Sequence, residues 1–483
     1  MTRSTPRVLA PRIVASVPRR DYSQISFWLE TCGDVLTPRM PLDGAAVADV
    51  AIMGAGYTGL WTAYYLLRAE PTLRVVILER DIAGFGASGR NGAWCAPGLN
   101  ISLGRLERLH GRDAARATYQ AVFDAVDEVG RVAADESLDI DWRRGGELLV
   151  ARGPHETPQL EHELAGLERF GLESHYQFLD AVALSERLSI SSASGALYTP
   201  DAATVQPAKL ARGLARTVER MGATIHEGTE VTDFRPRSNT SPATLRTPSG
   251  TVTADTIVLA AEAYLTRLRR LHRALIPIWS LIVLTEPLPD DAWAEIGWRA
   301  HELIGSPRYT VVYLSRTADG RLLFGGRGAP YRYGSPIRDE YDRHAPTHET
   351  LRTLAREWFP ALARHGVRFT HAWGGPLGMP RDWHPTISHD PASGIGTARG
   401  YVGHGVSTAN LAGRTLAELI LGRQTKRTSL PLVGHRSRNW EPEPLRWLGV
   451  RFVQAALGRV DRLAEASGQP PRGRSLEEWL ARH

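Results

Sequence analysis

The stretch that decides the fold is VADVAIMGAGYTGLWTAYYLLRA, residues 47–69. Its apolar first part, residues 47–53, predicts a buried strand, and residues 58–69 have the composition of a helix that stops before Pro71. The run LRVVILE at 73–79 predicts a second buried strand. Strand, helix and strand follow one another at the spacing of a βαβ unit, which indicates a parallel sheet.

Three glycines between the first strand and the helix form a dinucleotide-binding fingerprint. Gly54 permits the tight turn, Gly56 lets the backbone approach a pyrophosphate, and Gly59 allows the helix to pack closely on the strand. The N–H groups at the helix start attract phosphate charge. Glu79 lies 20 residues after Gly59 (79 − 59), where a carboxylate binds an adenosine ribose and repels a 2′-phosphate. The fingerprint predicts NAD or FAD and disfavours NADP.

The segment after Glu79 favours FAD over NAD. It reads RDIAGFGASGRNG at 80–92, and its small residues offer free N–H groups to an extended flavin. Residues 84–89 also match G-x-G-x-x-G, but no strand leads directly into them, so we reject that match.

The rest of the chain alternates between two kinds of pattern. A helix at 207–221 and strands at 224–226, 230–234 and 256–261 continue the α/β pattern, whereas 276–330 predicts antiparallel strands. Further helices are expected at 105–137, over most of 155–190, and at 347–364, 407–421 and 445–463. We therefore predict an α/β fold, α+β overall, in which a Rossmann-like FAD-binding domain is interleaved with an antiparallel-sheet substrate domain. The predicted parts are an extension at 1–44, the FAD-binding domain at 45–104, 191–271 and 366–425, the substrate or cap domain at 105–190 and 272–365, and a basic helical extension at 426–483.

Composition narrows the class of protein. The chain has 483 residues, of which 42% are hydrophobic and 23% are charged, as in globular proteins. The sequence contains no run of about 18 apolar residues, so we expect no membrane span. Arg19-Arg20 has no apolar run after it, so we expect no secretory signal, and two cysteines fit a reducing cytoplasm.

The net charge of +6 can be assigned to the C-terminal tail, because residues 421–483 hold 12 Lys/Arg and 6 Asp/Glu (12 − 6 = +6). Such a tail can meet nucleic acid or an anionic membrane, but it lacks the Arg/aromatic interleaving that is typical of single-strand binding, and we expect no nucleic-acid partner.

These motifs resemble the FAD-dependent amine and amino-acid oxidoreductases of the D-amino-acid oxidase type. The similarity rests on GAGYTGLWTAYYL, ILERD and GASGRNGA, and on HAWGGP at 371–376 and GYVGHGVSTANLAGRTLAELILG at 400–422. The branch that it resembles contains gamma-glutamylputrescine oxidoreductase and the aminophosphonate oxidoreductases. The resemblance implies an enzyme that oxidises a C–N bond of a primary or secondary amine, with hydride transfer to the flavin, imine hydrolysis and peroxide formation from oxygen.

The resemblance also implies a set of site residues. Val231 corresponds to a backbone contact with adenine, Ala260 to a strand end beside the cofactor, and Gly403 to Ser407 to the loop that faces the flavin C2 carbonyl. The predicted FAD-binding residues are Gly54, Ala55, Gly56, Thr58, Gly59, Glu79, Arg80, Gly86, Ala87, Ser88, Arg90, Asn91, Gly92, Val231, Ala260, Gly403, Gly405, Val406 and Ser407. The predicted catalytic residues are His404, Tyr313, Arg327 and Trp373.

The sequence departs from the family pattern at the substrate. Many members carry an arginine soon after the conserved tryptophan to hold a carboxylate, but here none follows Trp373 until Arg381. A plain α-amino acid is therefore disfavoured, and Arg327 or Arg381 is expected to hold a remote anionic or polar group. Tyr309 and His384 are further candidates for substrate contact.

Other chemistries fit the sequence poorly. We expect no metal, since Pro346 interrupts any helix between His344 and His348 and no metal-binding spacing occurs. The run GVSTA at 405–409 lacks the context of a nucleophile elbow. A dehydrogenase with an acceptor other than oxygen, and a non-catalytic flavoprotein subunit or sensor, remain as alternatives. The sequence leaves the oligomeric state open.

Overall fold

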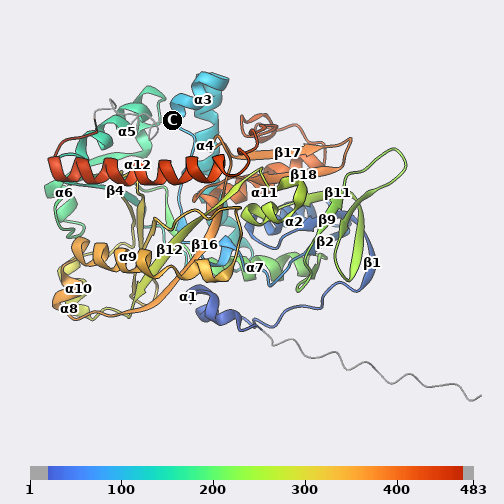
Figure 1. Cartoon of the computed structure of the whole chain (residues 1–483), viewed down its shortest axis with the longest axis horizontal. Helices are drawn as coiled ribbons and strands as arrows, with labels where there is room; N and C mark the ends of the chain where they lie inside the picture. Colours follow the sequence, from blue (N-terminus) through green and yellow to red (C-terminus); the bar gives the residue numbers. More distant parts are fainter. Residues whose placement is uncertain (1–19, 472–483) are drawn as a thin grey trace, which may run out of the picture.

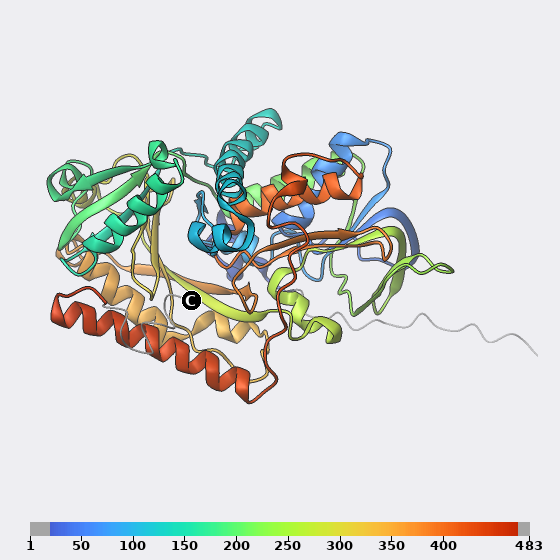
Figure 2. The ribbon, with the colours of Figure 1, turned by 90° about the horizontal axis from the view of Figure 1, so that it is seen from above.

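Two large sheets organise the computed structural model, which describes residues 20–471. The sheets lie side by side, with the N-terminal βαβ unit in one and the strands of residues 276–327 in the other (Figures 1 and 2). Of the regions discussed above, residues 1–19, with the first arginine of the Arg19-Arg20 pair, and residues 472–483 lie outside the described part of the chain. Among residues 20–471, no helix has the length and apolar character needed to cross a bilayer.

The first sheet is built on parallel pairing. β1 pairs with β2 and β11 in parallel, β2 with β8, and β11 with β18. Its strands are β1 (Gly44–Met53), β2 (Val75–Leu78), β8 (Thr224–His226), β9 (Asp233–Arg235), β10 (Ala243–Arg246), β11 (Gly250–Leu259), β17 (Thr386–Asp390) and β18 (Ile395–Arg399). The predicted βαβ unit is thereby confirmed.

Three helices that are far apart in the sequence cover this sheet. α2 (Tyr57–Ala69) packs against both α7 (Pro207–Arg220) and α11 (Gly405–Ile420). α7 begins where the Gln206 side chain accepts a hydrogen bond from the Lys209 amide, with Pro207 at the first helical position, as helix starts favour. The apolar faces of all three helices join one buried cluster with Val50, Ile52 and Val75 of the sheet.

The second sheet is mostly antiparallel and has the order β16-β12-β15-β14-β13-β4-β6-β5. Its strands are β4 (Glu147–Arg152), β5 (Gln177–Asp180), β6 (Ala193–Thr199), β12 (Ile276–Thr285), β13 (Leu303–Gly305), β14 (Val312–Arg316), β15 (Leu322–Arg327) and β16 (Phe369–Met379). A core containing Trp298, Phe324 and Trp358 joins it to the helices α6 (Ala181–Ser185), α8 (Asp290–Ile296), α9 (Ala345–Trp358) and α10 (Ala361–Arg364).

The remaining elements connect or border the sheets. They are α1 (Phe27–Thr31), α3 (Leu103–His110), α4 (Arg112–Asp135), α5 (Thr157–Arg169), the strand pair β3 (Trp94–Cys95) and β7 (Ala203–Thr204), α12 (Leu445–Ser467), and the short 3₁₀ helices η1 (Tyr22–Ile25), η2 (Ala87–Gly89), η3 (Glu173–His175), η4 (Glu262–Arg267), η5 (Arg269–Leu271), η6 (Asp339–Arg343) and η7 (Arg427–Ser429). In Figure 1, α12 runs lengthwise across the part of the molecule that holds the second sheet.

Several elements differ from expectation. The strand expected at 230–234 forms at Asp233–Arg235, and the stretch 155–190 contains β5 besides its helices. β6 and β16 belong to the second sheet, although both fall in segments expected for the FAD-binding domain. Conversely, α4 packs on α11 beside the first sheet. The domain boundaries remain a prediction, because the chain crosses between the sheets more often than composition indicates.

Candidate active site

A cavity of about 400 Å³ lies between the two sheets. From the first sheet and its helices it is lined by the ends of β1 and β2 and the starts of α2 and α11; β4, β13, β14 and β15 line it from the second sheet. Ligands in α/β folds bind beyond the carboxyl ends of parallel strands, which is where this cavity opens. Every predicted site residue except Ala55, Gly59, Trp373 and Ser407 lines it.

The glycine turn has the geometry that a pyrophosphate requires. Gly54 has φ +103°, and an added Cβ would lie 2.9 Å from the Ala260 carbonyl oxygen. Gly56 is the N-cap of α2 and provides no side chain to cap the helix, so backbone approach is unhindered. A Cβ at Gly59 would lie 2.0 Å from the Gly54 carbonyl oxygen, so only glycine allows α2 to approach the turn this closely. Gly59 therefore serves the packing of the helix on the turn and does not line the cavity.

Glu79 lies at the end of β2 beside this turn. Its carboxylate accepts hydrogen bonds from the amides of Ala55 at 2.9 Å and Asp81 at 3.0 Å. Burial raises its pKa to about 7 despite these bonds. A ribose hydroxyl that donates to this carboxylate would stabilise its charged form.

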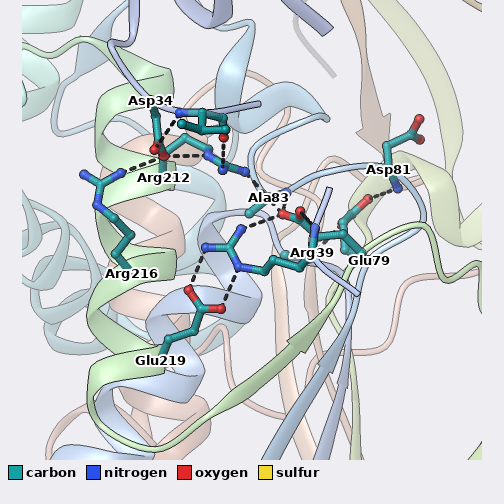
Figure 3. Close-up of polar contacts among 11 residues, drawn as sticks. Asp34, Arg39, Glu79, Asp81, Ala83, Arg212, Arg216 and Glu219 are labelled. Atoms are coloured by element: carbon teal, nitrogen blue, oxygen red, sulfur yellow. Dashed lines mark hydrogen bonds and ion pairs between the residues drawn. The ribbon is translucent and has the colours of Figure 1, made fainter. Parts of the chain in front are cut away.

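An ionic network behind Glu79 fixes the segment that follows it (Figure 3). The fully buried carboxylate of Glu227 accepts from the Ala83 amide at 2.7 Å and ion-pairs with Arg39 at 2.8 Å and Arg212 at 3.2 Å. Arg212 also pairs with Asp34 at 2.8 Å. The network therefore attaches the cofactor-facing loop to α7 and to residues 34–39.

The loop predicted to favour FAD joins the two sheets. Ser88 Oγ accepts a hydrogen bond from the Tyr57 amide at 2.9 Å, at the start of α2. The buried Arg90 guanidinium contacts Asp342 of η6 at 2.5 Å and donates to the Phe85 carbonyl at 2.7 Å. Contacts with the start of α2 on one side and with η6 on the other therefore fix this loop where it lines the cavity.

The start of α11 forms another wall. His404 is the N-cap residue but makes no side-chain capping bond, and Gly403 before it has φ +111°. Burial, together with the nearby Arg327 guanidinium, lowers the pKa of His404 to about 4, so the imidazole is neutral at pH 7. Ser407 points away and donates to the Ala96 carbonyl at 2.6 Å. Amides at a helix start stabilise negative charge placed against them.

Arg327 differs from the other arginines of the cavity. Arg80 pairs with Asp81, Arg90 with Asp342 and Arg267 with Glu230. Arg327 has no carboxylate partner within residues 20–471; its Nη2 donates to the Val402 carbonyl at 2.9 Å. Its pKa is lowered by burial. A guanidinium that faces a cavity without a carboxylate partner is a site for an anion.

Tyr313 lies next to this arginine in the sheet. Its hydroxyl is 2.8 Å from Ser280 Oγ, and burial raises its pKa to about 12, so it stays protonated. An added Cβ at Gly92 would lie 2.4 Å from the Tyr313 ring, so only glycine fits there.

Trp373 is the predicted catalytic residue that the structure places away from the cavity. It is 1% exposed, donates from Nε1 to the Arg90 carbonyl at 2.9 Å, and packs edge-on against Trp28. Gly375 and Leu377, on the same face of β16, line the cavity instead. Trp373 therefore supports the Arg90 loop from behind.

The three other substrate candidates also lie outside the cavity. Arg381 pairs with Glu441 at 3.1 Å near the surface, and the buried His384 stacks on His435. The Tyr309 amide donates to Asp461 of α12. Of the two arginines proposed for a remote anionic group, only Arg327 faces the cavity.

Sequence reasoning missed several lining residues, among them Glu147, Glu262 and Ser280. Of these three, Glu147 could have been noticed from the sequence, because it is the only charge in the otherwise apolar run GELLVA at 146–151. Nothing local marks the others. Over the described part of the chain, no group of three or more His, Cys, Asp or Glu side chains is arranged to hold a metal ion.

Comparisons with known proteins agree with this geometry. Residues 49–419 match the model of the family described as DAO, FAD dependent oxidoreductase. The chain is 33% identical to the probable oxidoreductase OrdL of Rhizobium meliloti, covering 80% of this chain and 86% of that protein. It is 31% identical to the gamma-glutamylputrescine oxidoreductase of Escherichia coli, covering 79% and 85%.

The fold also resembles solved structures. Glycine oxidase from Geobacillus kaustophilus matches with a TM-score of 0.68 and 22% identity over 82% of this chain and all of that one. L-proline dehydrogenase from P. horikoshii matches with a TM-score of 0.61 and 19% identity, over 81% of this chain and 96% of that one. These likenesses confirm the predicted class of fold.

Proposed function

Because the chain belongs to the DAO family of FAD-dependent oxidoreductases, we propose that it oxidises a C–N bond of a primary or secondary amine that carries an anionic group. The observation that supports this most directly is Arg327, the arginine of the cavity without a carboxylate partner in the described chain. A substrate anion would complete its ion pair.

The residues of the cavity fit FAD in their proposed roles. The turn at Gly54 and Gly56 would receive the pyrophosphate, Glu79 the ribose, and the α11 start the charged side of the flavin. When bound, FAD supplies the acceptor for the hydride that leaves the carbon next to the amine nitrogen.

The side chains of the cavity would then position the amine. Arg327 holds the anionic group, which restricts the orientation of the substrate. The neutral His404 imidazole and the protonated Tyr313 hydroxyl do not add charge near the amine. Such surroundings suit a neutral amine, from which hydride departs more readily than from an ammonium ion.

The test is an anaerobic panel of amines scored by loss of the flavin absorbance near ~450 nm. Polyamine conjugates, N-methyl amino acids and aminophosphonates should bleach the flavin, and readmitted air should restore it with formation of hydrogen peroxide. If air leaves the flavin reduced, the enzyme is a dehydrogenase with another acceptor. If NADPH alone bleaches the flavin, the proposed reaction is wrong.

A further inference from the structure

A second unpaired charge, of opposite sign, lines the same cavity. Glu147 on β4 contributes its carboxylate to the wall. Within residues 20–471 it has neither a hydrogen-bond donor nor a cationic side chain as a partner. Burial, together with repulsion from Glu163, raises its pKa to about 7. A half-buried carboxylate that faces a cavity without a partner is poorly solvated, and a bound cation would offset that cost.

Strand register places Glu147 diagonally across the cavity from Arg327. Gly325 of β15 pairs with Tyr313, Tyr313 with Gly305, and Gly305 with Leu149. Arg327 lies two residues beyond this row in one direction and Glu147 two residues beyond it in the other. Three strand spacings and four residues of offset separate them, about 14 Å across the strands and about 13 Å along them.

The surface between the two charges is partly aromatic. Gly305 has no side chain, and an added Cβ there would lie 3.2 Å from the Trp94 ring, so the indole covers this glycine. Near Glu147 the titratable neighbours are Glu163 of α5 and Tyr176, whose pKa that carboxylate also raises. Acidic and aromatic groups without a cation form an environment that attracts cations.

We propose that the corner at Glu147 binds a second, cationic group of the substrate, so that the substrate carries an anion at one end and an additional ammonium or guanidinium group at the other. This inference rests on the proposed function, since it assigns the opposite end of the same substrate. It narrows the proposed substrates from anionic amines in general to amines that carry an anionic group at one end and a cationic group at the other.

Two probes that differ only in the remote charge test this proposal. N-(4-aminobutyl)glycine and N-pentylglycine have the same number of non-hydrogen atoms, the same secondary amine and the same carboxylate. Titration calorimetry on the FAD-loaded wild-type protein should give the aminobutyl probe a Kd about 10–100-fold lower, as expected for a charge-assisted hydrogen bond. This comparison needs no variant.

The variant Glu147→Gln should remove that preference and leave the affinity for N-pentylglycine unchanged. Glu161→Gln removes the same charge from an exposed position on α5 and should keep the preference. The wild-type preference should also grow from pH 6 to pH 8 as Glu147 loses its proton, and Glu147→Gln should abolish that trend.

Equal affinity of the wild-type protein for both probes would overturn the proposal, as would equal weakening of both probes by Glu147→Gln. Failure of the proposed function has a different signature. In that case no amine reduces the flavin, while the calorimetric preference for the aminobutyl probe persists and supports the cationic corner.

Discussion

Arg327 and Arg381 look alike in the sequence but have different surroundings in the structure. Arg327 is the last residue of β15 and Arg381 follows β16, yet only Arg327 lines the cavity without a carboxylate partner in the described chain. The sequence identified both arginines as candidates for holding an anion. The ion pair of Arg381 with Glu441, however, depends on tertiary structure. The distinction therefore needed the structure.

The first prediction follows from this difference. Arg327→Met should raise KM for amines with an anionic group by about 10–100-fold, because a charge-assisted hydrogen bond contributes roughly 1.5–3 kcal/mol. Steady-state kinetics with anionic and neutral amines of equal length measure the effect. Arg381→Met serves as the control and should leave KM unchanged; a similar rise in both variants would contradict the assignment.

The second prediction concerns the glycine turn. Gly56→Asp should abolish FAD retention, because it places a carboxylate against the expected pyrophosphate, where a Cβ already meets Ser88 Oγ at 3.0 Å. Flavin absorbance of the purified protein measures retention. Gly104→Asp, on α3 with open space around the position, is the control. Full flavin occupancy in Gly56→Asp would refute the site.

At the scale of elements, strong periodicity and glycine patterns were sufficient for the βαβ unit and for α11, predicted at 407–421 and found at Gly405–Ile420. No strand was expected between residues 366 and 405, yet β16, β17 and β18 form there. In β16, Gly374, Gly375 and Gly378 face close neighbours such as Leu281, Arg90 and Glu262. Glycine here reflects close approach of neighbouring groups, which local propensity does not report.

α12 contacts the loop at the rim of the cavity. The buried Asp461 carboxylate accepts hydrogen bonds from the amides of Tyr309 at 3.1 Å and Thr310 at 2.7 Å, and from Thr310 Oγ1. Val311 and Val312, directly after these residues, line the cavity. The helix that was expected only as part of a basic C-terminal extension therefore positions a cavity wall.

The third prediction is that Asp461→Ala loosens this wall. Leaving two partly buried amides unpaired should lower the free energy of unfolding by about 1–3 kcal/mol. Hydrogen exchange at residues 306–311 should accelerate, and KM should rise more than kcat falls. Arg451→Ala, which removes an exposed charge from the same helix, is the matched control. Unchanged exchange at 306–311 would exclude a positioning role.

At the scale of the whole molecule, buried ionisable groups give stability a defined dependence on pH. Burial raises the pKa of Glu79, Glu147, Glu156 and Glu262 to about 7 and lowers that of His301, His384 and His404 to about 4. The contribution of each glutamate is present at low pH and lost as pH rises through 7. That of each histidine is present above about 6.5 and lost as pH falls through 4.

The fourth prediction follows from these signs. We consider protein from which the flavin has been removed. Below pH 6.5, the histidines lower stability as pH falls, whereas the glutamates lower it as pH rises. Above pH 6.5, only the loss of stability from the glutamates remains. Tm should therefore fall between pH 6.5 and pH 8, by a few degrees or more. Rebound FAD should reduce the slope if Glu79 gains a hydroxyl donor. A Tm that rises over this interval would contradict the surroundings assigned to these carboxyl groups.

The cavity draws its walls from both ends of the chain, with Gly54 near the beginning and Val406 near the end. During translation, therefore, more than four-fifths of the polypeptide must be synthesised before the residues that form the last wall of the cavity are present. Early segments can fold on their own as they emerge, but flavin cannot be enclosed at that stage. Cofactor loading thus becomes a late event in the life of the molecule, and a message truncated before codon 405 yields a polypeptide that has β1 and α2 yet lacks the means to enclose flavin.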